Sequence, residues 1–116
     1  FKGVILANGG VKNKTSADEL LLNTGADGIG IGQGALGRPW IFEEIKSQKS
    51  KVKSQEELFK IMLKHAKLAN KLKGKPGIME MRKHLCWYVS GLPKAGKLRQ
   101  KLVKVEILEE IKKILP

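Results

Sequence analysis

One stretch decides the fold class: VILANGG at residues 4–10, a short apolar run closed by two glycines. Such a run is typical of a parallel strand that is buried on both faces and ends in a loop. A helix is expected next, with Thr15 or Ser16 as its N-cap and Gly25 as its left-handed end. A second strand, DGIGI, follows at 27–31. Two strands separated by one helix predict a βαβ unit, which needs neighbouring strands to complete a sheet.

Both predicted strands end in glycine loops, Asn8-Gly9-Gly10 after the first and Gly32-Gln33-Gly34 after the second. α/β proteins place ligands at the carboxyl ends of their strands, where exposed N–H groups can hold a phosphate. Either loop alone is more simply a tight turn. The pair is a stronger signal, because the loops after strands 7 and 8 of (β/α)8 barrels commonly form a phosphate site.

Charge divides the 116-residue chain, whose net charge is +12. Residues 1–45 hold four basic and five acidic residues, whereas residues 46–116 hold 19 basic and six acidic ones, a net +13. Such asymmetry favours a second half that binds a polyanion. The simpler alternative is that its lysines only form a solvated surface. Hydrophobic residues make up 41% of the chain, which excludes a disordered polyelectrolyte.

The second half reads as helical, after a short helix start at Pro39 and a polar linker over 46–53. We therefore expect residues 1–45 and 54–116 to form separate domains. Helices are predicted from 54 to 73, from 77 to about 92, from about 94 to 103 and from 106 to 115, which together suggest a small bundle. Ser54 is expected to cap the first of these helices and Gly74 to end it. Its inward stripe is predicted to be Leu58, Ile61, Met62, His65, Leu68, Ala69 and Leu72. The second helix is predicted to turn Ile78, Met81, Leu85, Tyr88, Val89 and Leu92 inward, and the last one Ile107, Leu108, Ile111 and Leu115.

Location is indicated by what the sequence lacks. No apolar stretch approaches the roughly 20 residues of a membrane span, and no signal-peptide pattern precedes the first strand. Cys86 is the single cysteine, so no internal disulfide is expected and a cytoplasmic protein is predicted. Residue 1 is Phe rather than Met, and the sequence looks like a piece of a longer chain.

Taken in order, the motifs resemble the C-terminal part of bacterial tRNA-dihydrouridine synthases. The resemblance covers nearly all of the chain and is specific as a composite. It rests on Asn8-Gly9-Gly10, TGADG at 24–28, IGQGALGRPWIF at 31–42, MRKHLCWY at 81–88 and Gly91-Leu92-Pro93. It implies an α/β fold plus an all-α one: the last two β/α units of a (β/α)8 (TIM) barrel followed by a small helical bundle. The first six barrel units would lie in a missing N-terminal portion.

The family resemblance implies a flavoprotein that uses FMN, reduced by NADPH, to convert uridine in tRNA to dihydrouridine. The matching FMN-phosphate residues are Asn8, Gly9, Gly10, Gly32 and Gln33. Two of them depart from the family pattern, which often has an acidic residue at the position of Gly10 and usually Arg at that of Gln33. A charge-assisted phosphate contact is thereby replaced by a neutral hydrogen bond.

In the same family the helical domain grips tRNA. The candidates for RNA contact are basic residues of the second half, with the two arginines favoured because a guanidinium binds phosphate bidentately and stacks on bases. They are Arg82, Lys83, Lys94, Lys97, Arg99 and Lys101. Trp87 and Tyr88 can stack bases, but aromatics beside an apolar stripe are more often core residues.

No catalytic residue is assigned, because the catalytic cysteine of the family would lie in the missing portion. Cys86, in the middle of a helix, reads as a small buried hydrophobe, and His65 as a packed or hydrogen-bonded histidine. His84 is more exposed by its spacing and is a possible phosphate contact. No cluster has metal-ligand spacing, so no metal is expected.

Two other readings remain open at this point. A non-catalytic basic helical RNA-binding module would explain the charge and treat the α/β part as a folding cap. Another flavin-binding barrel acting on a small molecule would explain the glycine loops, but not the +13 of residues 46–116.

Overall fold

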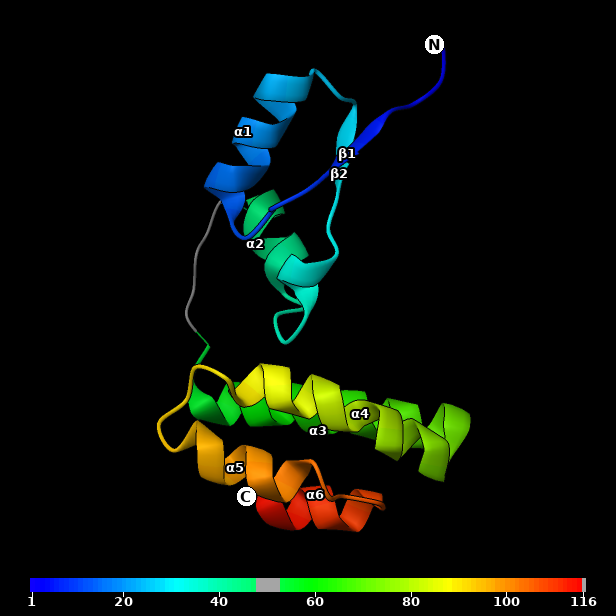
Figure 1. Ribbon diagram of the computed structural model, residues 1–116, viewed down its shortest axis with the longest axis vertical. Coiled ribbons are helices and arrows are strands. Elements are labelled where there is room, and N and C mark those ends of the chain that lie inside the picture. The colour runs from blue at the N-terminus through cyan, green and yellow to red at the C-terminus, as the bar shows by residue number, and fades with distance from the viewer. Residues whose placement is uncertain (48–52, 116) are drawn as a thin grey trace. The chain divides into compact units, whose positions relative to one another are not determined.

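The computed structural model describes residues 1–47 and 53–115, and the chain divides into two compact units (Figure 1). The strand unit is Phe1–Lys51 and the helical unit is Val52–Pro116. The linker predicted over 46–53 lies mostly outside the described residues. Its first two residues are helical, because helix α2 (Ile41–Ser47) continues through Lys46 and Ser47. The Ser47 hydroxyl donates to the Glu43 carbonyl at 2.7 Å, which extends this helix beyond the predicted boundary.

The strand unit contains β1 (Leu6–Asn8), α1 (Lys14–Thr24), β2 (Gly28–Gly30), the 3-10 turn η1 (Gln33–Ala35) and α2. β1 and β2 are hydrogen-bonded in parallel, with Leu6 opposite Gly28 and Asn8 opposite Gly30. The predicted βαβ unit is therefore present. Because the strands run in the same direction and in register, the loops that follow them start at the same edge of the sheet.

Helix α1 ends where the sequence predicts and begins earlier. Gly25 takes the left-handed conformation, with φ of 64°, and its N–H donates to the Leu21 carbonyl. The N-cap is Asn13 rather than Thr15 or Ser16: its side chain accepts from the Ser16 N–H at 2.8 Å, and the Ser16 hydroxyl accepts from the Asn13 N–H at 3.1 Å. This reciprocal capping box satisfies two donors, which a cap at Thr15 or Ser16 would leave unpaired.

The strand faces are not buried, contrary to the expectation from their apolar sequence. Val4 is 76% exposed and Leu6 64% exposed, and the helix residue Leu22 is 85% exposed. The sheet of the described residues has two strands, so neither strand has a second neighbour there. The buried hydrophobic side chains of this unit are Val11, Ala17 and Ile41, and none of them belongs to a strand.

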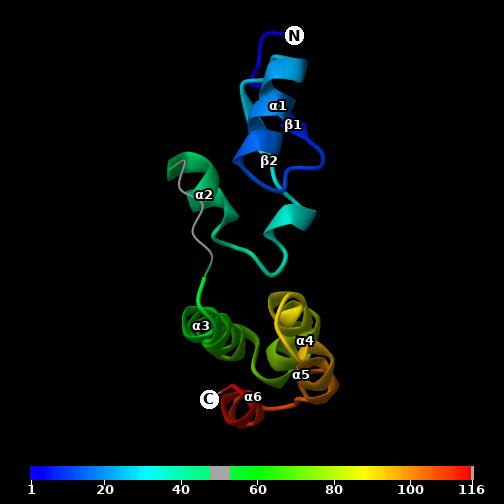
Figure 2. The same cartoon turned by 90° about the vertical axis from the view of Figure 1, so that its left-hand side faces the viewer.

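The helical unit contains α3 (Gln55–Lys73), α4 (Lys75–Val89), α5 (Ala95–Leu102) and α6 (Leu108–Ile114). Helix α3 packs on α4 and α6, and α5 packs on α4 and α6. Figure 2 looks nearly along α3, α4 and α6 and shows the four helices around a common centre. That centre holds side chains that are at most 2% exposed: Met62, Ile78, Met81, Leu85, Val89, Leu102, Val105, Ile111 and Leu115. The predicted small bundle is observed.

The ends of α3 match the sequence, and its buried face matches in part: Leu58 and Met62 of the predicted stripe are buried. Ser54 caps the helix by accepting from the Glu57 N–H at 3.2 Å, and Gly74 ends it with φ of 64°. The buried residues are Leu58, Phe59, Met62 and Ala66. Of the predicted stripe, Leu68 is 54% exposed and Leu72 is 72% exposed. The later part of the stripe is exposed because α4 and α6 together cover the face of α3 that carries Phe59 and Ala66.

Helix α4 follows its prediction more closely. Ile78, Met81, Leu85, Tyr88 and Val89 are all buried, as their spacing indicates. The helix begins two residues earlier than predicted, at Lys75, since Pro76 suits the first turn. In the last helical segment Ile111 and Leu115 are buried as expected, whereas Ile107 is 50% exposed because it is the N-cap that precedes α6.

Candidate cofactor pocket and nucleic-acid interface

A pocket of about 360 Å³ lies at the carboxyl ends of β1 and β2. It brings together all five residues that the sequence suggests for phosphate binding. Its described lining is Asn8, Gly9, Gly10, Val11, Lys12, Gly30, Ile31, Gly32, Gln33 and Gly34, which we call the strand-end pocket. The loop after β1 and the loop after β2 thus form one concave surface, as parallel adjacent strands require.

Glycine is required at several positions of this pocket for different reasons. Gly9 and Gly10 have φ of 146° and 65°, conformations that residues with a Cβ rarely adopt. Gly34 is required for space, since a Cβ there would collide with the Val11 carbonyl oxygen and contact the Ile41 side chain. The two loops therefore approach each other to backbone contact at Gly34 and Val11.

Arg38 holds the loop after β1 against the start of α2. Its Nη1 donates to the Lys12 carbonyl at 3.2 Å, and its Nη2 forms an ion pair with Glu44 Oε2 at 2.7 Å. Sequence reasoning missed this positioning role, because residues 12, 38 and 44 meet only in the folded chain. An arginine directly after a glycine-rich loop was the available signal.

Lys12 was also missed, although it follows the first glycine loop by two residues. It is the charged residue among the described lining of the strand-end pocket, and that lining contains no carboxylate. A glycine-rich backbone with one cation and a neutral Gln33 suits an anionic group with several acceptor oxygens. The residues present therefore fit a phosphate.

The six predicted RNA contacts all lie in the helical unit, on α4 and α5 or next to them. Lys83 is exposed on α4, and Lys97, Arg99 and Lys101 are exposed on α5. Lys94 is the N-cap of α5 and has φ of 60°, which is unusual for a residue with a Cβ. α4 and α5 pack on each other, so the six candidates lie on or beside two neighbouring helices.

Arg82 differs from the other five. Its side chain is half-buried, and its Nε donates to the carbonyl oxygen of Val105 at 2.8 Å. That bond joins α4 to the segment between α5 and α6. Arg82 therefore has a structural role that sequence reasoning did not foresee, beside any contact that its outer nitrogens make.

The two histidines face each other across α3 and α4. Their ring centroids are 5.3 Å apart, and His65 Nδ1 shares a hydrogen bond of 3.0 Å with the Tyr88 hydroxyl. Burial lowers the pKa of His65, and burial together with the neighbouring His65 lowers the pKa of His84. The expectation of a hydrogen-bonded His65 is met. Tyr88 is buried, whereas Trp87 is 37% exposed.

Cys86 is a half-buried thiol on α4. Burial raises its pKa, and the nearby Arg99 only partly opposes that effect. A thiol with a raised pKa is a poor nucleophile at neutral pH.

Among residues 1–47 and 53–115, no group of three or more His, Cys, Asp and Glu side chains is placed to hold a metal ion. Across the same residues, none of the helices combines the length and apolar character that a membrane span requires.

The geometry shows an α/β unit with a glycine-lined pocket at the ends of its strands, followed in sequence by a basic helical unit. The chain belongs to the dihydrouridine synthase family: the family described as "Dihydrouridine synthase (Dus)" matches residues 2–116. This membership bears out the resemblance seen in the sequence motifs.

Three curated relatives illustrate the match. The chain is 34% identical over 113 residues to a "Probable tRNA-dihydrouridine synthase" of Mycobacterium leprae, which covers 92% of this chain and 29% of that protein. It is 39% identical over 101 residues to the Rickettsia typhi protein of the same name, covering 82% and 31%. With "Probable tRNA-dihydrouridine synthase 1" of Synechocystis sp. it shares 32% identity over 116 residues, covering 96% and 33%. The chain thus spans about a third of the length of these relatives.

Proposed function

We propose that this chain is part of an FMN-dependent tRNA-dihydrouridine synthase. In this proposal the strand unit supplies the last two β/α units of a (β/α)8 barrel, and the helical unit binds tRNA. The observation that carries the proposal is the strand-end pocket, in which Asn8, Gly9, Gly10, Gly32 and Gln33 line one concavity at the ends of two parallel strands. Membership of the dihydrouridine synthase family supports it.

The residues of the strand-end pocket would hold the phosphate of FMN. Gly9, Gly10 and Gly32 let the backbone approach the phosphate closely, and Lys12 supplies the positive charge that the neutral Gln33 lacks. Arg38 keeps the loop in place through the Lys12 carbonyl. When bound and reduced by NADPH, FMN supplies the hydride for the uridine base.

The exposed strand faces are consistent with a barrel completed by other strands. Val4 and Leu6 of the β1 segment and Leu22 of α1 are 76%, 64% and 85% exposed. Burying such side chains against neighbouring strands and helices contributes roughly 25 cal/mol per Å² of apolar surface. The isoalloxazine ring would need the loops of those other strands, so we expect the chain alone neither to retain FMN on gel filtration nor to reduce uridine.

The test uses the longer synthase of which we propose this chain to be a part. Gly34→Ala places a Cβ against the Val11 carbonyl and should force the two loops of the pocket apart. We expect the variant to lose bound FMN, measured by flavin absorbance, and to lose NADPH-dependent dihydrouridine formation in unmodified tRNA.

Gly96→Ala is the matched control, because a Cβ at that position on α5 meets no atom within 4 Å. It should keep both flavin and activity. Full flavin content in the Gly34→Ala protein would contradict the assignment of the phosphate site, and a wild-type protein that makes no dihydrouridine would contradict the proposed reaction.

A further inference from the structure

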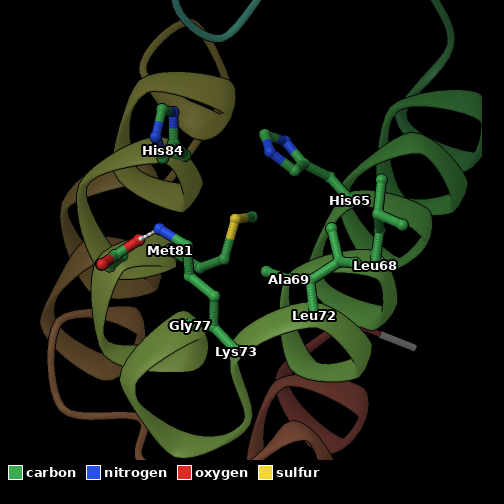
Figure 3. Close-up of a pocket in the computed structure, with 9 residues that line it drawn as sticks. His65, Leu68, Ala69, Leu72, Lys73, Gly77, Met81 and His84 are labelled. Atoms are coloured by element: carbon green, nitrogen blue, oxygen red, sulfur yellow. Dashed lines mark hydrogen bonds and ion pairs between the residues drawn. The ribbon is translucent and has the colours of Figure 1, made fainter.

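A second concavity, of about 200 Å³, lies between α3 and α4 in the helical unit. We call it the histidine groove. It is lined by His65, Leu68, Ala69, Leu72 and Lys73 from α3 or its end, and by Gly77, Glu80, Met81 and His84 from α4. Figure 3 shows the His65 ring and the Met81 side chain projecting into the space between the two helices. At Gly77 the backbones of α3 and α4 come close together, because a Cβ there would collide with the Ala69 carbonyl oxygen.

Apolar and aromatic side chains line the histidine groove, and several of them are exposed to solvent. Leu68 and Leu72 are 54% and 72% exposed along its α3 side, although they belong to the apolar stripe of that helix. On the α4 side, His84 lies 5.3 Å from His65 and 5.2 Å from Trp87, measured between ring centroids. A row of three rings thus runs from the groove to the exposed edge of Trp87.

The size of the groove limits what can enter it. Drug-sized ligands occupy pockets of about 300–1,000 Å³. A groove of about 200 Å³ therefore admits a single ring system rather than a helix or an intact cofactor.

Charge around the groove indicates how the rest of the ligand is held. Lys64, Lys71 and Lys83 are exposed and adjacent in sequence to groove residues. Inside the groove, Lys73 and Glu80 form an ion pair of 2.7 Å that closes one end. A carboxylate in the wall opposes entry of a phosphate, whereas the exposed lysines on the same two helices attract one outside the groove. The ligand that matches is a flat ring carried on a polyanion.

We propose that the histidine groove binds an unpaired nucleobase of the RNA, with the phosphates of that strand attracted by Lys64, Lys71 and Lys83, which are exposed on the same two helices. The inference rests on the proposed function in that it takes RNA as the partner of the helical unit. Base stacking on His84 and contact with Leu68 and Leu72 supply affinity that no phosphate contact provides.

The protonation state of the rings suits this role. Burial lowers the pKa of His65 and of His84, which favours the uncharged imidazole at neutral pH. His65 shares the hydrogen bond with the Tyr88 hydroxyl through Nδ1, so that bond does not use Nε2. A neutral imidazole offers both a stacking face and a hydrogen-bonding nitrogen for a base edge.

The experiment measures binding of short RNA by the whole chain carrying Trp40→Phe, so that Trp87 is the remaining tryptophan reporter. Two probes are compared at equal length, an oligouridine and an abasic ribose-phosphate oligomer. We expect the oligouridine to quench Trp87 fluorescence and to bind about fivefold to 100-fold more tightly than the abasic probe.

The variant Leu68→Gln/Leu72→Gln removes the apolar wall at exposed positions and so keeps the fold. It and His84→Ala should abolish the difference between the probes while retaining their common, salt-dependent affinity. Ile107→Gln, a leucine-sized exposed apolar residue outside the groove, is the matched control and should behave as the parent.

Equal affinity for both probes, with no quenching, overturns the proposal but leaves RNA binding by the helical unit intact. If neither probe binds at low salt, both the proposal and the RNA-binding role on which it rests are overturned. A concentration-dependent dimer that Leu68→Gln/Leu72→Gln dissolves also overturns the proposal, because a second copy would then cover the groove.

Discussion

Arg82 and Arg99 carry the same charge and lie on neighbouring helices, but they differ in what they touch. Arg82 Nε donates to the Val105 carbonyl, whose residue is only 1% exposed, whereas the Arg99 side chain is exposed on α5. Removing Arg82 would leave a buried acceptor without that donor. The two arginines should therefore be separable by stability.

We expect Arg82→Ala to lower the free energy of unfolding by about 1–3 kcal/mol, the range for a charged hydrogen bond and a buried acceptor left unpaired. Arg99→Ala should change it by less than about 0.5 kcal/mol, as exposed substitutions do. Urea unfolding followed by circular dichroism measures both. Arg82→Lys restores the charge but not the geometry of the Nε donor, so it should recover only part of the lost stability. Equal stability of Arg82→Ala and Arg99→Ala would show that the Val105 contact contributes nothing.

His65 and His84 make stability depend on pH. Burial lowers the pKa of each in the folded chain, so the unfolded chain binds protons more readily as the pH falls. Stability is therefore complete above the unfolded value of about 6.5 and declines as the pH drops through that value toward the lowered folded pKa. The charged neighbours of His84 act in opposite directions, Lys83 lowering its pKa and Glu80 raising it, while His65 faces the neutral Tyr88 hydroxyl.

The urea concentration at the unfolding midpoint of the parent should decrease as the pH is lowered from about 7.5 to about 5.5. Ordinary carboxylates titrate below this range. His65→Asn/His84→Asn removes both histidines of the chain and should flatten this decline. A parent whose midpoint does not move, or a double variant that declines equally, would contradict the assignment to this pair.

At the scale of elements, local chemistry predicted helix ends better than helix faces. Gly25 and Gly74 end α1 and α3 as expected, and Ser54 caps α3, because each acts on backbone groups within a few residues. Asn13 displaced Thr15 and Ser16 as the cap of α1 because the capping box uses Ser16 from the third position of the helix. Such a choice is decided by two side chains together.

The buried face of α3 could not be read from its own sequence. The stripe that includes Leu68 and Leu72 is a valid apolar face, but α4 and α6 together cover a face centred on Met62 and Ala66. The displaced leucines became a wall of the histidine groove. The periodicity of the α3 sequence does not show how α3 packs on α4 and α6. That packing explains both why Leu68 and Leu72 are exposed and why they line the histidine groove.

In the strand-end pocket, too, the local sequence predicted some residues, whereas others could be found only from contacts in the folded chain. Its two glycine loops were predicted from sequence because glycine after a strand signals an unusual backbone. Lys12 and Arg38 were not predicted, since their roles depend on contacts across the folded unit: Lys12 lines the pocket, and Arg38 reaches its carbonyl from 26 residues away.

At the scale of the whole molecule, charge separates the two units. The helical unit, from 52 to 116, holds 16 basic and six acidic residues, while the strand unit, from 1 to 51, holds seven basic and five acidic ones. The six acids of the helical unit are partly used in exposed ion pairs such as Lys60–Glu56 and Lys75–Glu106. Exposed pairs of this kind contribute little to stability, and most of the basic residues exceed the number that the acids can pair. The proposed RNA binding by the helical unit would use this excess charge.

Binding of unmodified tRNA by this chain, titrated with salt beside a duplex DNA of equal length, tests that interaction. We expect tRNA to be preferred, and the preference to persist as salt rises, because shape and unpaired bases add to phosphate attraction. Lys97→Ala/Arg99→Ala/Lys101→Ala should reduce the slope of log affinity against log salt by about 0.7–0.9 for each phosphate that these side chains no longer neutralise. Lys2→Ala, which removes a charge from the strand unit, is the control and should leave the slope unchanged. Binding to tRNA and DNA that is equal and is erased together by salt would mean that the basic surface attracts any polyanion, and the recognition of tRNA would then have to come from the rest of the synthase.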